Sequence, residues 1–142
     1  TDSTNSLLYF KGATRTNGPS HDMIAYCWTP IEGYSRFGKY SGNNSATGPF
    51  VWCGFRPSWV LIKHRDTTTN WQLFDDARDL QNPTETWLEP NTNGIEQTHA
   101  DVKIDLLSNG FKLRGDDSGI NASAVYVFAA FARHPFKTAR GR

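Results

Sequence analysis

The residues best suited to catalysis are acidic side chains that gather in the middle of the chain. They are Asp75, Asp76, Asp79, Glu85 and Glu89. Glycoside hydrolysis uses two carboxylates held about 5 to 10 Å apart across a sugar, and spacing in a sequence does not establish that separation. Because Arg78 lies among them, we expect a structural ion pair with Asp75 or Asp79 rather than catalysis. The enzyme alternative that stays open is a polysaccharide depolymerase.

The other reactive residue types form no recognisable site. The acidic cluster offers oxygen ligands for Ca²⁺, but the EF-hand spacing with its central glycine is missing. The histidines are too far apart for a zinc motif. These are His21, His64, His99 and His134. Cys27 and Cys53 lie in aromatic stretches, where we expect free, buried thiols rather than a disulfide. The sequence therefore predicts no catalytic residue, no metal and no cofactor.

Two tryptophans are candidates for ligand binding because they border polar, turn-rich stretches. Trp71 follows Asp66–Asn70, and Trp87 follows Asn82–Thr86. A partly exposed tryptophan offers a flat apolar face that stacks on a sugar ring or anchors an interface. With neighbouring hydrogen-bonding side chains, the candidate site comprises Trp71, Trp87, Asn70, Gln72, Glu85 and Asn91. The competing interpretation is that both tryptophans only cover the end of a sheet.

Composition and charge argue against two classes of partner. The chain has 142 residues, enough for one domain with a buried core. Its 15 basic and 14 acidic residues leave a net charge of +1, whereas a nucleic-acid-binding protein usually carries a basic face. Basic residues concentrate only near the end, and we expect 138–142 to be a flexible basic tail. No apolar stretch approaches the length that crosses a bilayer. Neither nucleic-acid binding nor membrane insertion is expected.

These side chains must be positioned by β-strands. The aromatic content of five Trp, nine Phe and five Tyr favours pleated, half-buried surfaces. No segment of ten or more residues repeats apolar positions at helical spacing, and turn-forming residues separate the short apolar stretches. The predicted strands are Leu7–Phe10, Ile24–Trp28, Arg36–Tyr40, Phe50–Cys53, Trp59–His64, Trp71–Phe74, Val102–Leu106, Phe111–Leu113 and Val125–Ala132. We therefore predict an all-β fold with little or no helix: an antiparallel β-sandwich, with a jelly roll as one form of it.

Two adjacent stretches carry the predicted core. Trp59–Ile62 is apolar without alternation, which indicates a strand buried on both faces. Before it, Phe50 and Trp52 alternate with smaller apolar residues, and we expect both aromatics to be buried. The polar segment Ser41–Thr47 is left free to face a partner.

The first third of the chain resembles the last third in the order strand, Lys/Arg-Gly, polar turn and long apolar strand. Without a gap, Lys11-Gly12 aligns with Arg114-Gly115, and Ile24 aligns with Val127. We interpret residues 1–33 as the closing strands of a preceding similar module or an N-terminal extension, and 34–137 as one complete β-sandwich module. The simpler explanation is that two hairpins look alike because hairpins do.

Five sequence blocks in a fixed order resemble a known β-module. The blocks are Phe37–Lys63; Trp71–Asp75 with Ala77-Arg78-Asp79; Asn82-Pro83; Asp105–Gly115; and Ala129–Ala132 with Pro135-Phe136. In this order they resemble a module that occurs in tandem in tail-fibre and other virion structural proteins of tailed bacteriophages, marine phages and cyanophages especially. The resemblance covers the chain from about residue 24 to 137.

The resemblance implies a non-enzymatic structural and adhesion module on the surface of a phage particle, assembled in the bacterial cytoplasm. A tail fibre or fibre-like appendage that contributes to host-surface recognition is the leading expectation. The implied partners are other virion proteins, further copies of the chain as in trimeric phage fibres, and a host surface glycan. The alternatives are a carbohydrate-binding module for host or environmental glycans, and a capsid decoration or head-fibre protein.

Overall fold

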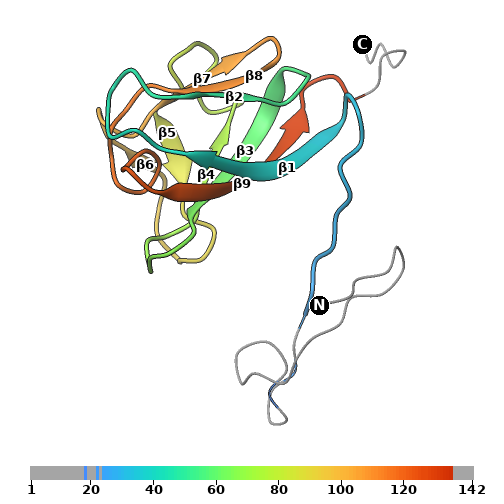
Figure 1. The fold of residues 1–142 in the computed structure, drawn as a ribbon, viewed down its shortest axis with the longest axis horizontal. Helices are drawn as coiled ribbons and strands as arrows, with labels where there is room; N and C mark the ends of the chain where they lie inside the picture. Colours follow the sequence, from blue (N-terminus) through green and yellow to red (C-terminus); the bar gives the residue numbers. More distant parts are fainter. Residues whose placement is uncertain (1–17, 19–21, 23, 136–142) are drawn as a thin grey trace.

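The computed structural model describes residues 18, 22 and 24–135. Within this part of the chain, two antiparallel sheets pack face to face (Figure 1). In spatial order, the larger sheet consists of β1 (Ser35–Ser41), β9 (Val125–Ala132), β3 (Pro57–His64), β4 (Gln72–Asp75), β5 (Thr86–Leu88) and β6 (Gln97–Thr98). The smaller sheet consists of β2 (Phe50–Trp52), β8 (Gly110–Leu113) and β7 (Ile104–Leu107). None of the described residues is helical. The predicted all-β sandwich is confirmed.

The larger sheet combines a meander with one long-range strand. The strands from β3 to β6 follow one another in sequence order, whereas β9 lies between β1 and β3. Tyr126 of β9 is paired on one side with Tyr40 of β1 and on the other with His64 of β3. Within the described residues the sandwich has sheets of six and three strands, whereas a jelly roll has eight strands in two Greek keys.

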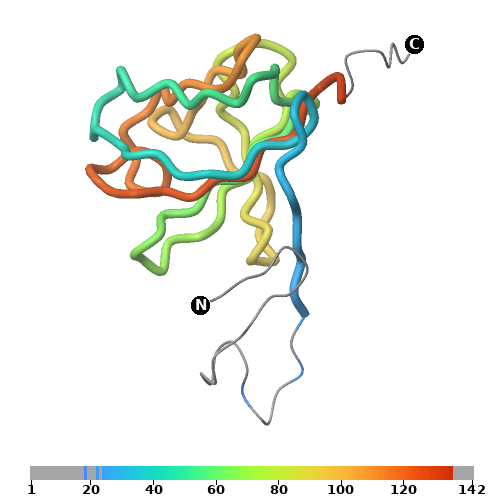
Figure 2. The backbone as a smooth tube through the Cα atoms, turned by 45° about the vertical axis from the view of Figure 1, so that its right-hand side comes forward, coloured from blue at the N-terminus to red at the C-terminus, as the bar shows by residue number. Residues whose placement is uncertain are grey.

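Most strands lie where apolar patterning predicts them, and β9 spans the predicted residues. The predicted strand Leu7–Phe10 lies outside the described residues. The predicted strand Ile24–Trp28 is wrong: this segment pairs with no strand, and it runs away from the sandwich (Figure 2). Alternation of apolar residues supplies no partner for backbone hydrogen bonds, which a strand requires. Strands β5 and β6 were not predicted, because strands of three and two residues are too short to show alternation of apolar residues.

The core lies between the two sheets and is built from alternate residues of each strand. On β9 the inward-facing residues are buried, whereas the outward-facing residues are half-buried. The buried residues are Tyr126, Phe128, Ala130 and Ala132. Phe111 of β8 meets Phe128 edge-on at a centroid distance of 5.4 Å, and Tyr40 stacks on Tyr126 at 5.1 Å. The contact between Phe111 and Phe128 joins the two sheets, whereas the contact between Tyr40 and Tyr126 joins neighbouring strands of the larger sheet.

The core prediction for β2 is wrong at its aromatic residues. Val51 is the inward-facing residue of this strand, so alternation turns Phe50 and Trp52 outward. They are 44% and 55% exposed. The guanidinium of Arg36 lies over the Trp52 ring, 5.0 Å from its centroid, and covers part of it.

Strand β3 has one fully buried face rather than two. Val60 and Ile62 are completely buried between the sheets, whereas Trp59 and Leu61 on the outer face are half-buried. The reason is that the smaller sheet covers only one side of the larger sheet. The unbroken apolar run therefore supplies both a core and an apolar outer surface.

Candidate functional site

Five of the six residues of the predicted ligand site line two separate hollows. Trp71 and Asn91 line a groove on the outer face of the larger sheet, which we call the aromatic groove. Asn70, Gln72 and Trp87 line a different hollow, which we call the polar cleft. The two places differ in chemical character and have different surroundings.

The aromatic groove has a volume of about 760 Å³, and its lining contains no charged residue. Outward-facing residues of four neighbouring strands form its floor: Phe37 of β1, Val127 and Ala129 of β9, Trp59 and Leu61 of β3, and Leu73 of β4. Its rim is formed by Tyr26, Trp28, Trp71 and Pro90. An exposed apolar groove with a polar rim residue such as Asn91 is a candidate interaction site.

The segment that precedes β1 places exposed aromatic rings beside this groove. Trp28 stacks on Phe37 at a centroid distance of 6.1 Å, and Tyr26 stacks on Trp28 at 6.0 Å. The segment is tied to β1 because the hydroxyl of Ser35 donates to the carbonyl oxygen of Thr29 at 3.1 Å. Even so, Tyr26 and Trp28 are 75% and 62% exposed. The sequence analysis misses these two residues as site residues because it places them inside a strand.

A hydrogen-bond network between two loops fixes the position of Trp71. The backbone N–H of Trp71 donates to Asn91 Oδ1 at 2.9 Å, and Asn91 Nδ2 donates to Asn70 Oδ1 at 2.8 Å. Asn70 Nδ2 in turn donates to Glu89 Oε2 at 2.8 Å. The β3–β4 and β5–β6 loops that carry these residues project on the same side of the sandwich as the segment before β1 (Figure 2). The two asparagines therefore join the loops.

The prediction that Trp87 offers an exposed stacking face is wrong. The side chain is only 6% exposed and packs against Phe74 at a centroid distance of 6.4 Å. Trp87 lies on β5, which has neighbours on both sides, and its ring points into the core. The polar stretch before Trp87 indicated an exposed side chain, but most of that stretch is a loop, and its exposure does not extend to Trp87 in the strand.

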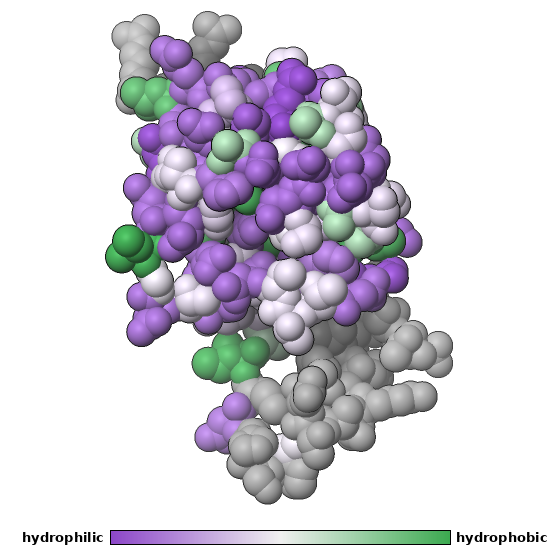
Figure 3. All heavy atoms as spheres, turned by 90° about the vertical axis from the view of Figure 1, so that its left-hand side faces the viewer, coloured by the Kyte–Doolittle hydropathy of each residue, from purple (hydrophilic) through white to green (hydrophobic). Residues whose placement is uncertain are grey.

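The polar cleft is lined mainly by hydrophilic residues and has a volume of about 450 Å³. Strands β4, β5 and β6 contribute Gln72, Trp87, Gln97 and Thr98, and the turn before β9 contributes Asp117, Ser118 and Gly119. The end of the sandwich where Figure 1 labels β6 is covered mostly by hydrophilic residues (Figure 3). This cleft is therefore suited to a polar ligand, whereas the aromatic groove is suited to an apolar one.

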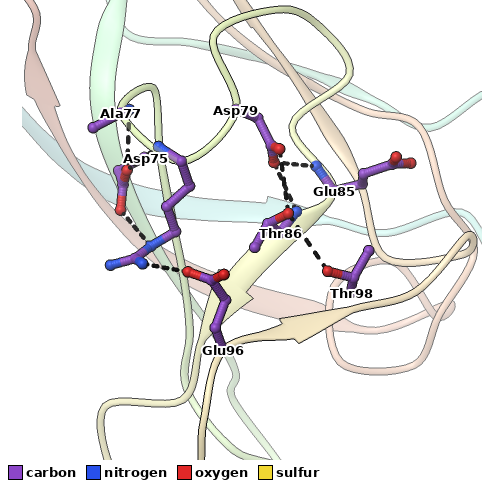
Figure 4. A network of polar contacts seen from close by, with 8 residues as sticks. Asp75, Ala77, Asp79, Glu85, Thr86, Glu96 and Thr98 are labelled. Atoms are coloured by element: carbon purple, nitrogen blue, oxygen red, sulfur yellow. Dashed lines mark hydrogen bonds and ion pairs between the residues drawn. The ribbon is translucent and has the colours of Figure 1, made fainter.

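Two of the acidic residues considered for catalysis, Asp75 and Asp79, hold loops in place (Figure 4). Asp75 Oδ1 accepts hydrogen bonds from the backbone N–H groups of Ala77 and Arg78 at 3.0 and 2.9 Å. Asp75 Oδ2 forms an ion pair with Arg78 Nε at 2.9 Å, which confirms the predicted pair. The Arg78 guanidinium also pairs with Glu96, and hydrogen bonding to that carboxylate is the main reason that its pKa is raised.

Asp79 has a similar role at the start of β5. Its Oδ2 accepts hydrogen bonds from the backbone N–H groups of Glu85 and Thr86 at 2.9 and 2.8 Å, and its Oδ1 accepts from the Thr86 hydroxyl at 3.2 Å. Glu85 lines neither hollow, so its predicted part in a ligand site has no geometric support. Asp75 and Asp79 therefore both have structural partners.

The two cysteines are free, as predicted, but only one of them is buried. Cys53 is 4% exposed, whereas Cys27 lies exposed in the segment before β1. Burial raises the pKa of the Cys53 thiol to about 12, and the positive charge of Arg36 opposes part of that shift. Cys53 is therefore protonated and unreactive at neutral pH. The expectation of a buried Cys27 is wrong because its segment is not a strand of the sandwich.

Asn121, which is not among the predicted site residues, organises the polar loop after β1. Asn121 is completely buried, and its Nδ2 donates to the carbonyl oxygens of Ser45 and Gly115 at 2.8 and 2.9 Å. Its Oδ1 accepts from the backbone N–H of Asn43 at 3.0 Å. The Ser41–Thr47 segment is therefore fastened to the turn before β9. The sequence indicates only a turn at Asn121, and no local pattern distinguishes this asparagine from an exposed one.

The described residues contain neither a group of side chains placed to hold a metal ion nor a membrane-spanning helix. No group of three or more His, Cys, Asp or Glu side chains there is close enough to hold a metal ion. No described segment forms a helix that could span a membrane.

Comparison with known proteins yields one match. A family model described as "Domain of unknown function (DUF7483)" matches residues 1–135. No curated protein and no solved structure matches the chain. The matched range includes the whole of the predicted unit 1–33 and all but the end of the predicted unit 34–137. The division between the two units stays a prediction.

Proposed function

The chain belongs to the DUF7483 family, whose description assigns no function, and we propose that it is a non-enzymatic structural and adhesion module of a bacteriophage virion. The tail fibre or a fibre-like appendage is its proposed location. The five sequence blocks that resemble phage virion modules support the virion assignment. The aromatic groove is the single structural observation that supports a role in assembly.

The proposed occupant of the aromatic groove is a second copy of the chain. Every copy carries both the uncharged groove and, beside it, the exposed rings of Tyr26 and Trp28. Aromatic side chains are enriched at protein interfaces and often provide most of the binding energy there. A symmetric assembly lets these rings on one copy enter the groove of the next. The lack of charge in the groove argues against a polyionic partner.

Light scattering coupled to size-exclusion chromatography tests the assembly surface. We expect an oligomer, with a trimer of about three times 16.0 kDa as the leading form. The double variant Trp28→Ala/Trp71→Ala should dissociate it, whereas Trp52→Ala should not. Trp52 is a matched control because it is 55% exposed but belongs to the other sheet. A wild-type monomer at all concentrations would refute the proposed interface.

The virion assignment and the non-enzymatic assignment need separate tests. Gold-labelled antibody on intact phage particles should mark the tail fibre; labelling of the head would favour the capsid decoration alternative, and absence from particles would refute both. Incubation with host polysaccharide should release no reducing sugar. Release that Asp75→Ala or Asp79→Ala abolishes would identify a depolymerase instead.

A further inference from the structure

Two side chains that line the polar cleft each carry a buried polar atom without a hydrogen-bond partner. The atoms are Oε1 of Gln72 and Nε1 of Trp87, and both side chains are only 6% exposed. Buried polar groups in proteins are nearly always paired, so each exception calls for an explanation. One of these atoms is an acceptor and the other is a donor. A ligand hydroxyl group can donate to the Gln72 oxygen or accept from the Trp87 N–H, because a hydroxyl both donates and accepts.

The charges around the cleft restrict the class of ligand. No Lys or Arg lines the cleft, which argues against phosphate, nucleotides and acidic sugars. The two acidic side chains that line it already have partners: Glu89 Oε2 accepts from Asn70 Nδ2 at 2.8 Å, and Asp117 Oδ1 accepts from the Gly119 N–H at 2.7 Å. The remaining polar lining is mostly neutral amides and hydroxyls, which are the groups that hydrogen-bond to neutral polyols.

The walls of the cleft are held in place before any ligand arrives. The turn on one side is anchored to the core because the hydroxyl of Tyr126 donates to the carbonyl oxygen of Ser118 at 2.8 Å. Gly119 lies so close to Gln72 that a Cβ atom there would be 2.2 Å from Gln72 Nε2. The carboxamide of Gln72 therefore packs directly against the turn backbone. Preorganisation of this kind reduces the entropy that binding costs.

We propose that the polar cleft binds a neutral saccharide through the Gln72 carboxamide and the Trp87 indole N–H. The volume of about 450 Å³ lies within the usual range of small-molecule sites. Trp87 takes part through the edge of its ring rather than through a stacked face, which is covered by the core. The site does not involve the aromatic groove, so it stands or falls separately from the proposed assembly surface.

Two-dimensional ¹H–¹⁵N NMR of the indole N–H groups tests the proposal directly. The chain has five Trp, and Trp87→Phe identifies the signal of Trp87. The probes are the methyl glycosides of glucose, galactose, mannose and N-acetylglucosamine, titrated to about 50 mM so that millimolar dissociation constants are detected. We expect at least one probe to shift the Trp87 signal in a saturable way. Contacts from probe protons to the Trp87 indole N–H in a nuclear Overhauser experiment on the wild-type protein should accompany the shift.

Gln72→Leu should weaken that binding about tenfold or more, because it removes the buried carboxamide. Gln81→Leu makes the same chemical change at an exposed position and should leave the affinity within about twofold. The proposal is overturned if no neutral probe shifts the Trp87 signal, if Gln72→Leu binds as well as Gln81→Leu, or if only N-acetylneuraminic acid or glucosamine binds. Should Gln72→Leu fail to fold, the nuclear Overhauser contacts in the wild-type protein decide the question alone.

Discussion

Replacing Asn121 with alanine should destabilise the sandwich strongly, although the residue lies in a turn. The wild-type side chain is completely buried and contacts the loop after β1 as well as its own turn. Alanine leaves the backbone N–H of Asn43 and the carbonyl oxygens of Ser45 and Gly115 without this partner. A tight interior gives water little room to replace it.

The magnitude follows from the hydrogen bonds that are lost. The two hydrogens on Nδ2 and the acceptor Oδ1 account for three bonds, each worth about 1 kcal/mol net, so the expected loss is about 3 kcal/mol. In urea, a slope of about 1 to 3 kcal/mol per molar converts this loss into a fall of about 1 to 3 M in the unfolding midpoint. The slope itself should not change.

Equilibrium urea unfolding, followed by tryptophan fluorescence, measures this loss. Ser123→Ala is the matched control because Ser123 is exposed in the same turn, and it should change the stability by less than about 0.5 kcal/mol. A loss below about 1 kcal/mol for Asn121→Ala would refute the reasoning. It would mean that the loop after β1 rearranges without cost or that water satisfies the exposed groups.

Three further predictions concern the thiols and the acidic cluster. A thiol reagent such as dithionitrobenzoate should label exposed Cys27 rapidly in the native protein and Cys53 only after unfolding; equal rates would contradict the described burial. Between pH 9 and 12 the unfolded chain releases the Cys53 proton while the folded chain keeps it. The contribution of this thiol should therefore lower the free energy of unfolding by at most about 1.4 kcal/mol per pH unit. The slope should be smaller in Cys53→Ala, and an unchanged slope would refute the assignment. Asp79→Ala should cost about 1 to 3 kcal/mol in urea unfolding because it leaves the N–H groups of Glu85 and Thr86 unpaired, whereas Asp79→Asn keeps an acceptor and should cost less.

Much of the fold is accessible from the sequence because local patterns reflect local constraints. The apolar run of β9 and the turn residues around the strands predict the all-β class and most strand positions. The ion pair of Asp75 with Arg78 is also predictable, because the two residues are close in sequence. The pairing of β5 and β6 is not predictable from the sequence, because such short strands show no alternation of apolar residues.

The candidate site shows the opposite case. Trp87 follows a polar stretch yet is buried, and Trp52 lies in an aromatic stretch yet is exposed. The residues that flank a tryptophan in sequence do not determine whether its side chain is buried, because burial depends on which face of the strand the other sheet covers. The same limit applies to the two neighbours of Trp71. Asn91, which contacts Trp71, lines the aromatic groove with it, whereas Gln72, which is next to Trp71 in sequence, lines the polar cleft.

The sequence by itself determined the β-class and most strand positions, and it limited the ion pair of Arg78 to Asp75 or Asp79, because each of these depends on residues within a few positions of one another. Only the tertiary structure decided which face of each strand is covered. Among the described residues, the smaller sheet packs on only one face of the larger sheet, which leaves the outer face with Trp59, Leu61 and Leu73 open as a groove. The structure also brought Gln72, Trp87 and Gly119 together in one cleft. Such contacts between distant segments depend on packing, which no local pattern encodes.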